Sequence, residues 1–377
     1  MRMFFLIEKS LTFIYLYILL FIEIKKLNIY INLIKIKESF NMYNYEFGMQ
    51  LHITDDCDQR CKHCYVFNDK SFQRSYLSFL DVKKIVENFC GLCEYLECNP
   101  SIALTGGDPL IHTEFWEIVE YLHQKNISFD ILGNPFHLNL DLAKRLKALG
   151  CEIYQISIDG MKTTHDFIRK TGSFDASIEA INILNKAGIE SHVMMTVSQM
   201  NYKEVIDVIR YVVAIPVGGF AFARYCPTLL DRGIYGIPPY EYRKFLAQVW
   251  DVYNELVCCE TKFFLKDHLW IPFLYEKGLF QTKEEDVIYE GCGCAMRHVC
   301  VLTNGDIYAC RRFNSKIGNA LQDSFKDVFF SENIAPYRDF EKMECYNCKL
   351  FNYCRGCPAV SYGTYGSFYK KDPQCWR

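Results

Sequence analysis

The sequence predicts an α/β fold, namely a partial (β/α)6 TIM-like barrel followed by a small cysteine-rich α+β domain. From Phe47 to about residue 235, short runs of β-branched and aromatic residues alternate with amphipathic helical stretches. This alternation is typical of βα units around a parallel sheet. Farther along, the helical periodicity weakens and nine cysteines occur between residues 292 and 375, which indicates a second domain with its own chemistry.

Six βα units account for the barrel. The candidate strands are residues 47–54, 101–105, 128–132, 152–158, 190–197 and 218–225. The helical stretches lie near residues 80–96, 113–125, 140–149, 174–187 and 202–214. Several of them end at a glycine, for example Gly150 and Gly188, as helix C-termini often do. Six such units predict a barrel that is not fully closed.

The chain has 377 residues, more than one hydrophobic core usually serves, so we expect two domains. Residues 47–235 are assigned to the barrel, 236–284 to a helical linker and 285–377 to the cysteine-rich domain. Within the last domain, Asn304-Gly305 interrupts an alternating run at residues 299–310, which predicts a β-hairpin.

Residues 1–46 form an atypical apolar extension. Ile, Leu, Phe, Lys, Tyr and Asn supply 32 of the first 41 residues, and Gly, Ala and Pro are absent from them. The apolar run from Leu11 to Ile22 has 12 residues, fewer than the roughly 20 that a helix needs to span a bilayer. We therefore expect the functional chain to begin near Met42 and to be cytoplasmic, with a membrane anchor as the alternative.

Charge and cysteine content narrow the class of protein. A net charge of −3 and the absence of a long Lys/Arg run argue against nucleic acid as a partner. The 19 cysteines are an odd number in a chain much longer than small disulfide-stapled domains. Thiolate ligands for metal explain this excess better than disulfides do.

Three of the thiols lie close together in "DDCDQRCKHCYVF", residues 55–67, directly after the first predicted strand. Their spacing is Cys57-x3-Cys61-x2-Cys64. Closed zinc or iron-sulfur sites normally take four protein ligands, so three thiols suit a 4Fe-4S cluster with one iron left open. The alternative is a loop with three buried thiols and no metal.

This spacing, followed by the aromatic Tyr65, resembles the cluster loop of the radical S-adenosylmethionine (radical SAM) enzymes. The resemblance implies that S-adenosylmethionine occupies the open iron. The stretch "LTGGDP", residues 104–109, ends the second strand and resembles the family's motif for the amino group of this cofactor. The residues concerned are Gly106, Gly107, Asp108 and Pro109. Taken alone, this stretch is also a good turn.

The same resemblance implies further cofactor contacts. Ser157 and Asp159 would lie near the ribose, Arg169 near the carboxylate and Thr196 near the adenine. Asn134 lies in "LGNP", where related enzymes often have Thr-Asn-Gly, and is assigned to the methionyl end. The alternatives are a turn at Asp159, a surface ion pair for Arg169 and core packing at Thr196.

The second group of cysteines resembles the SPASM domain, which holds auxiliary 4Fe-4S clusters in peptide-modifying radical SAM enzymes. The resemblance assigns one cluster to Cys294, Cys300, Cys310 and Cys357, and a second to Cys345, Cys348, Cys354 and Cys375. Cys292 fits the loose spacing as well as Cys294 does, and the gap after Cys354 has two residues where three are common. A structural zinc site is the alternative. Among the remaining cysteines, Cys226 ends the sixth strand, where barrels collect catalytic groups, although core packing also explains it.

The resemblance implies an enzyme that cleaves S-adenosylmethionine to a 5'-deoxyadenosyl radical and modifies a peptide or protein. We expect maturation of a ribosomally made peptide through a thioether or carbon-carbon cross-link, with flavodoxin or ferredoxin as electron donor. An anaerobic sulfatase maturase is one alternative, although Arg311 stands where that group has an aspartate. A non-catalytic iron-sulfur electron carrier and a zinc-bound interaction protein are the others. No catalytic acid or base is assigned.

Overall fold

The computed structural model describes residues 46–67, 75–228, 236–283, 288 and 290–377. Its centre is a ten-stranded sheet with the strand order β10-β9-β8-β1-β2-β3-β4-β5-β6-β7. The seven strands of its parallel series are β1 (Glu46–Thr54), β2 (Asn99–Gly106), β3 (Phe129–Leu132), β4 (Cys151–Ser157), β5 (Glu190–Val197), β6 (Gly219–Arg224) and β7 (Lys262–Phe264). The order is linear, so the barrel is open, as the sequence predicted.

The three remaining strands come from the C-terminal domain: β8 (His298–Val301), β9 (Asp306–Tyr308) and β10 (Lys316–Asn319). Strand β8 runs parallel to β1, from Gly48 opposite His298 to Leu51 opposite Val301. Strands β9 and β10 then add in antiparallel fashion. The two predicted domains therefore share one continuous sheet.

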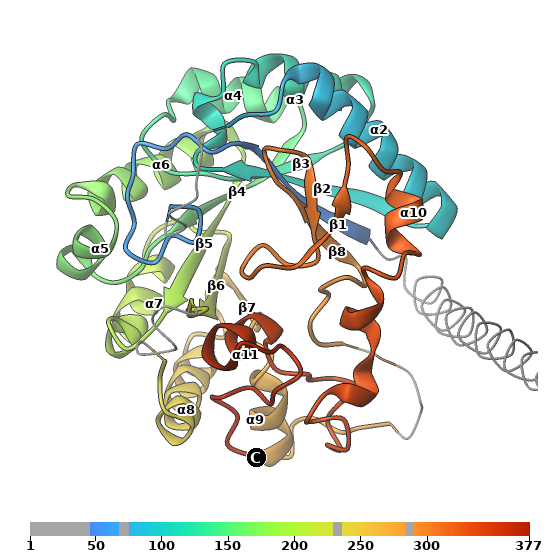
Figure 1. The fold of residues 1–377 in the computed structure, drawn as a ribbon. Coiled ribbons are helices and arrows are strands. Elements are labelled where there is room, and N and C mark those ends of the chain that lie inside the picture. The colour runs from blue at the N-terminus through green and yellow to red at the C-terminus, as the bar shows by residue number, and fades with distance from the viewer. Residues whose placement is uncertain (1–45, 68–74, 229–235, 284–287, 289) are drawn as a thin grey trace, which may run out of the picture.

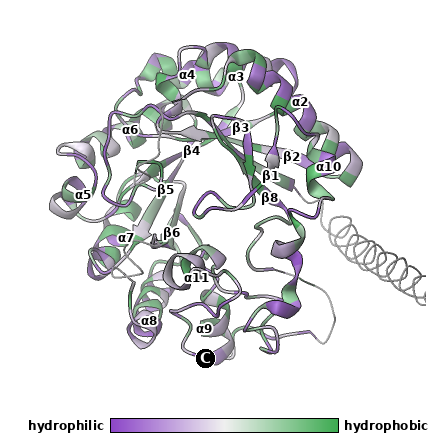
Figure 2. Cartoon of the chain, in the orientation of Figure 1, coloured by the Kyte–Doolittle hydropathy of each residue, from purple (hydrophilic) through white to green (hydrophobic). Residues whose placement is uncertain are grey.

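Helices cover the outer face of the curved sheet (Figure 1). The barrel helices are α2 (Phe79–Leu96), α3 (Phe115–Gln124), α4 (Leu140–Ala148), α5 (Lys162–Ile168), α6 (Ser173–Ala187) and α7 (Val205–Val213), with the short η1 (Pro109–Ile111) and η2 (Tyr202–Glu204). Both hydrophobic and hydrophilic residues mark these helices (Figure 2), as expected for helices that bury one side. In β1 the alternate residues Phe47, Met49, Leu51 and Ile53 are buried in this core.

Of the later elements, the short helix at Phe325–Phe329 packs beside α2 on the outside of the sheet, and the others lie around the open side of the barrel (Figure 1). The later elements are α8 (Pro239–Glu255), α9 (Trp270–Glu276), α10 (Phe325–Phe329) and α11 (Pro358–Tyr365), with η3 (Ala335–Arg338) and η4 (Phe340–Lys342). Gly363 of α11 touches the chain just after β6, since a Cβ atom there would lie 1.8 Å from the carbonyl oxygen of Pro227. The C-terminal domain is thus packed against the barrel.

The predicted elements are found with small shifts at their ends. The hairpin at Asn304-Gly305 is confirmed, but its turn is longer than two residues, because the amide of Leu302 closes it by donating to the carbonyl of Asp306 at 2.9 Å. Helix α5 was not predicted, nor were β10, α10 and α11 of the C-terminal domain. Strand β7 was not predicted either; it lies within the predicted linker and pairs with β6. The domain limits themselves stay predictions.

Residues 1–45 of the apolar extension, including the run from Leu11 to Ile22 and the expected start near Met42, lie outside the described residues, and Glu46 already belongs to β1. Within the described part of the chain, no helix is both long enough and apolar enough to cross a bilayer.

Candidate active site and metal centres

The end of β2 holds the start of the three-cysteine loop. The amide of Gly107 donates to the carbonyl oxygen of Thr54 at 2.7 Å, and the amide of Asp108 donates to that of Asp56 at 2.7 Å. A Cβ atom on Gly106 would lie 2.0 Å from the oxygen of Thr54, and one on Gly107 would lie 2.0 Å from the oxygen of Asp56. The two glycines therefore let the backbone of β2 touch the backbone that leads into the cysteines.

Cys57, Cys61 and Cys64 are half-buried on this loop. Burial is the main cause that raises the pKa of Cys57, and burial, with Cys64 and Cys57 nearby, raises the pKa of Cys61 to about 11 although Arg169 opposes the shift. Asn134 donates to Cys57 Sγ at 3.7 Å, and Arg169 Nη1 donates to Cys61 Sγ at 3.8 Å. Thiols that crowd together in this way are suited to a cationic iron centre, because a bound metal stabilises the thiolate form.

Asp108 lies fully buried beside this loop. Its Oδ1 accepts from the amide of Leu110 at 3.4 Å, whereas its Oδ2 has no hydrogen-bond partner among the described residues. Burial raises the pKa of Asp108 to about 7. An unpartnered buried carboxylate oxygen fits the ammonium group of S-adenosylmethionine. Pro109 follows as the buried first residue of η1.

Asp159 and Arg169 form an ion pair next to the cluster loop. Arg169 Nε lies 2.5 Å from Asp159 Oδ2, and His63 Nε2 lies 3.5 Å from the same oxygen. The amide of Thr196 donates to Asp159 Oδ1 at 2.8 Å. Burial alone would raise the pKa of Asp159, but Arg169 and His63 outweigh it, so the pKa lies below its ordinary value. Asp159 therefore does more than form a turn. Its ion pair with Arg169 is largely buried and is not a surface contact.

The other predicted cofactor residues lie at the same end of the barrel. Ser157 is the half-buried last residue of β4, and Asn134 follows β3. Tyr65 is exposed, with the guanidinium of Arg311 5.0 Å from its ring centroid. The structure thus brings these residues to one rim, while their roles toward the cofactor stay predictions.

Sequence reasoning missed Asp58, which lies between two of the loop cysteines. Asp58 accepts from Asn134 at 2.9 Å and pairs with Lys170 at 3.2 Å. Asp58, Asp108 and His137 bring one ligand atom each within 4.8 Å of one another. Its place inside the Cys57-x3-Cys61 spacing was the only signal that sequence could offer.

The thiols assigned to the first auxiliary cluster gather at the junction of β8, β9 and the barrel. Cys292 and Cys294 are hydrogen-bonding partners, and the pKa of Cys294 is raised by Cys292, by burial and by the nearby Cys310 and Cys300. Cys300 Sγ also lies 3.4 Å from Gln50 Oε1 of β1. Burial raises the pKa of Cys300 to about 12. These four thiols thus form one group, in which either Cys292 or Cys294 can serve as ligand.

Cys357 joins this group from the opposite side. The thiols of Cys226 and Cys292 are both near enough to Cys357 to raise its pKa. Arg312 Nη1 donates to Cys226 Sγ at 3.5 Å. The hydrogen bond with Cys357, together with the positive charge of Arg312, lowers the pKa of Cys226 to about 6 although burial opposes the shift. Cys226 therefore lies at the first auxiliary group and is not core packing alone.

The second predicted set also lies together. Burial, then Cys348 and Cys375, raise the pKa of Cys345 to about 11. Burial is likewise the main cause that raises the pKa of Cys354 to about 12, with Cys375 among the nearby charges. The four thiols predicted for this cluster thus share one neighbourhood.

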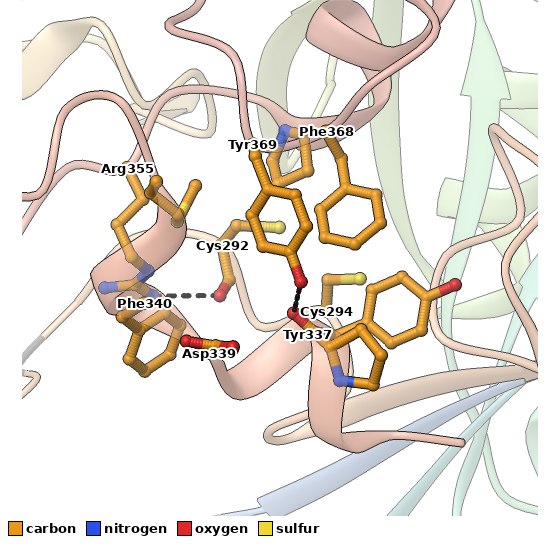
Figure 3. A pocket seen from close by; sticks show the side chains of 11 residues that line it. Cys292, Cys294, Tyr337, Asp339, Phe340, Arg355, Phe368 and Tyr369 are labelled. Atoms are coloured by element: carbon orange, nitrogen blue, oxygen red, sulfur yellow. Dashed lines mark hydrogen bonds between the residues drawn. The ribbon is translucent and has the colours of Figure 1, made fainter. Parts of the chain in front are cut away.

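A surface pocket opens beside the first group. Cys292 and Cys294 line it together with aromatic rings of Tyr337, Phe368 and Tyr369 (Figure 3). Arg355 donates to the carbonyl oxygen of Cys292 at 3.0 Å. The thiols thus lie near the protein surface on this side.

A buried arginine ties β6 to both sets of thiols. Arg224 Nε lies 2.6 Å from Asp267, and its two Nη atoms lie 2.7 and 2.8 Å from the two oxygens of Asp372. Asp372 Oδ2 also accepts from the amide of Cys357 at 2.8 Å, and its carbonyl accepts from the amide of Cys375 at 3.0 Å. One carboxylate residue therefore anchors a member of each set.

Comparisons with known proteins agree with this arrangement. The chain is 25% identical over 336 residues to the AdoMet-dependent heme synthase of Nitratidesulfovibrio vulgaris, covering 86% of this chain and 90% of that protein. It is 26% identical over 344 residues to the mycofactocin maturase MftC of Mycolicibacterium smegmatis, covering 86% and 81%. Streptococcus suis SuiB bound to its precursor peptide SuiA has the same fold, with a TM-score of 0.71, 17% identity and coverage of 90% and 78%.

Two family models match separate parts of the chain. The radical SAM superfamily matches residues 51–212, and the iron-sulfur cluster-binding SPASM domain matches residues 292–358. These ranges contain the three-cysteine loop and most of the auxiliary thiols, respectively. The chain is thus a radical SAM enzyme with a SPASM domain, a family that implies S-adenosylmethionine and iron-sulfur clusters as cofactors.

Proposed function

We propose that this enzyme matures a ribosomally synthesised peptide, forming a thioether or carbon-carbon cross-link. The observation that carries the radical chemistry of this proposal is the position of Asp108, whose Oδ2 is buried beside the Cys57, Cys61 and Cys64 loop and has no partner among the described residues. A thiol cluster alone fits an electron carrier or a zinc site equally well. A buried carboxylate oxygen without a donor is suited to a ligand that brings one, such as an ammonium group.

Each residue at this rim has a distinct part in the proposal. Cys57, Cys61 and Cys64 hold a 4Fe-4S cluster, and Asp108 receives the ammonium group of S-adenosylmethionine. Asp159 holds Arg169 in place, and the guanidinium then faces Cys61 and the cofactor carboxylate. When bound, the cluster and S-adenosylmethionine supply a 5'-deoxyadenosyl radical, which takes a hydrogen atom from the substrate. The open barrel and the C-terminal domain position the peptide and exclude water.

The auxiliary thiols support the rest of the proposal. Two groups of four thiols or more fit two further 4Fe-4S clusters, which makes three clusters in all. If bound there, these clusters would supply a place for the electron that is released when the cross-link forms on the substrate radical. Flavodoxin or ferredoxin is proposed as the one-electron donor to the enzyme. Cys300 of the first group is buried, whereas all four thiols of the second group are half-buried, which favours the second cluster as the one nearer to solvent.

One residue, Arg311, favours formation of a peptide cross-link over formation of formylglycine. Arg311 follows Cys310 and contacts the ring of Tyr65 on the cluster loop. A cation there cannot act as the carboxylate base expected of a sulfatase maturase. The SuiB complex with a precursor peptide supports a peptide substrate for this fold.

A second candidate is chemistry on a porphyrin. The match to a relative named as a heme synthase covers 90% of the length of that relative, which favours this alternative. A porphyrin bears carboxylates, and Arg311 and Arg312 next to Cys310 offer cations that would bind them. The two candidates differ in the substrate that changes mass when it is incubated with the enzyme.

The test uses the full chain, purified and reconstituted without oxygen. We expect about twelve irons per chain, and release of 5'-deoxyadenosine from S-adenosylmethionine with reductant. Mass spectrometry of peptides encoded near the gene should then show loss of hydrogen. Zinc in place of iron, with no deoxyadenosine, would overturn the whole proposal. Deoxyadenosine with four irons would remove only the auxiliary clusters, and mass change in a porphyrin alone would select the second candidate.

A further inference from the structure

The first auxiliary group contains more thiols than one cluster can use. Besides the predicted Cys294, Cys300, Cys310 and Cys357, it includes Cys292, and Cys226 contributed by the barrel. A four-iron cluster takes one protein ligand at each iron. Cys292 and Cys294 are neighbours on one loop, so they compete for one corner. Cys226 and Cys357 are neighbours only because the fold brings β6 against the start of α11.

Several contacts fix Cys226 in this place. Arg312 Nη1 donates to its Sγ at 3.5 Å, and its Sγ lies 3.9 Å from the carbonyl oxygen of Arg224. The following residue, Pro227, packs against Gly363 of α11 so closely that no side chain fits between them. The thiol is therefore held where it is by backbone packing on one side and a guanidinium on the other.

The same contacts hold Cys357 opposite. The amide of Cys357 donates to Asp372 Oδ2, which also pairs with Arg224 two residues before Cys226. The two thiols thus lie at the two ends of one buried network, and each is near enough to shift the pKa of the other.

We propose that Cys226 and Cys357 are alternative ligands for one corner of the first auxiliary cluster, so that the barrel itself can ligate this cluster. The inference rests on the proposed auxiliary cluster. In either arrangement one sulfur binds iron as a thiolate and the other keeps the proton, hydrogen-bonded to the ligating sulfur. The iron keeps four ligands and its charge does not change. Arg312 lies near both sulfurs, so its positive charge offsets the thiolate charge in either arrangement.

The test compares Cys226→Ser, Cys357→Ala and the double variant in the reconstituted full chain. Iron and sulfide content are measured together with the EPR spectrum of the reduced protein. We expect Cys357→Ala to keep the iron content of the unchanged protein with a shifted EPR signal, because Cys226 takes the corner. The double variant should lose iron from this cluster, to a three-iron form or to none. Cys90→Ala, a half-buried thiol on α2, is the matched control and should change neither quantity.

Two results would overturn the inference. The first is loss of as much iron from Cys357→Ala alone as from the double variant. The second is an EPR signal of Cys357→Ala that does not change when Cys226→Ser is added. If the double variant does not fold, the iron content and spectrum of Cys357→Ala still decide the question. If the unchanged protein holds only four irons, the auxiliary clusters of the proposed function fail, which is a separate outcome.

Discussion

Arg224 and Asp372 form a bidentate ion pair that is buried between the barrel and the C-terminal domain, with N–O distances of 2.7 and 2.8 Å. Burial alone would raise the pKa of Asp372, but Arg224 outweighs it and holds the pKa below its ordinary value. Because the same carboxylate residue accepts the amides of Cys357 and Cys375, this pair links the position of both auxiliary sets to β6.

Removing the arginine should therefore affect both stability and iron content. Arg224→Met leaves Asp267 and Asp372 buried without their cation, and breaking a buried pair from one side costs about 3–5 kcal/mol. We expect a clear drop in the thermal midpoint and fewer irons per chain after reconstitution. Arg210→Met, which breaks an exposed pair with Glu255, is the control and should change both little. Unchanged iron content in Arg224→Met would show that the pair does not position the auxiliary thiols.

The glycines at the end of β2 give a second prediction. Gly106→Ala or Gly107→Ala places a Cβ atom 2.0 Å from a backbone carbonyl oxygen of the cluster loop. The loop must shift, so we expect loss of about four irons and of 5'-deoxyadenosine release. Gly91→Ala on α2 meets nothing within 4 Å and should raise the free energy of unfolding by about 0.5–1 kcal/mol. Equal iron content in all three variants would contradict this role for Gly106 and Gly107.

Asp108 predicts a pH dependence of stability. Its pKa in the folded chain is raised to about 7 by burial, whereas an aspartate in an unfolded chain titrates at about 4. The folded state thus keeps a proton that the unfolded state loses, so this group lowers the free energy of unfolding as pH rises from about 4 to about 7. Asp108→Asn cannot titrate and should lack this component. Urea midpoints of the apoprotein at pH 5 and pH 8 should fall less in the variant than in the unchanged chain.

The same group predicts how the cofactor binds. A carboxylate attracts an ammonium group, and the protonated acid does not, so affinity for S-adenosylmethionine should increase as pH rises through about 7. Equilibrium dialysis of the reconstituted chain at pH 6 and pH 8 measures this. Asp108→Asn should bind weakly at both values. A variant that keeps the full pH dependence would place the titrating group elsewhere.

We expect Arg169→Lys to impair the enzyme, although lysine keeps the positive charge. Its guanidinium contacts Asp159 through Nε and Cys61 through Nη1, and a lysine cannot make both contacts. Outer partners of metal ligands typically contribute about 10–100-fold in metal affinity or activity, so we expect Arg169→Lys to lower deoxyadenosine release by about that factor. Lys162→Gln, which removes an exposed pair with Asp175, is the control. Full activity in Arg169→Lys would mean that the charge alone suffices.

The βα part of the fold could be predicted because most of its strands and helices are long enough to show a clear hydrophobic period. Strand β5 was predicted with its bounds as found, and α2 within one residue. Strand β7 has three residues and α5 has seven, so both are too short for a hydrophobic pattern to identify them. They form because β6 and the loop after β4 offer partners, which is information that a local pattern does not contain.

The site was predicted as a set of residues and not as a set of contacts. The spacing of Cys57, Cys61 and Cys64 indicated their chemistry, and the structure places Asp108 beside them. That Gly106 and Gly107 pack on the protein's own backbone, and that Cys226 meets Cys357, depends on how distant segments approach. No spacing rule connects β6 to the start of α11, so this contact had no local signal.

Because β8 pairs with the edge of β1, the C-terminal domain protects the barrel from aggregation. Without residues 298–301, the backbone groups from Gly48 to Leu51 would have no strand on that side, in a segment whose alternate side chains are already apolar. Such an exposed strand readily pairs with another chain and aggregates. A barrel expressed alone would therefore be expected to associate with copies of itself, even with its own cluster loop intact.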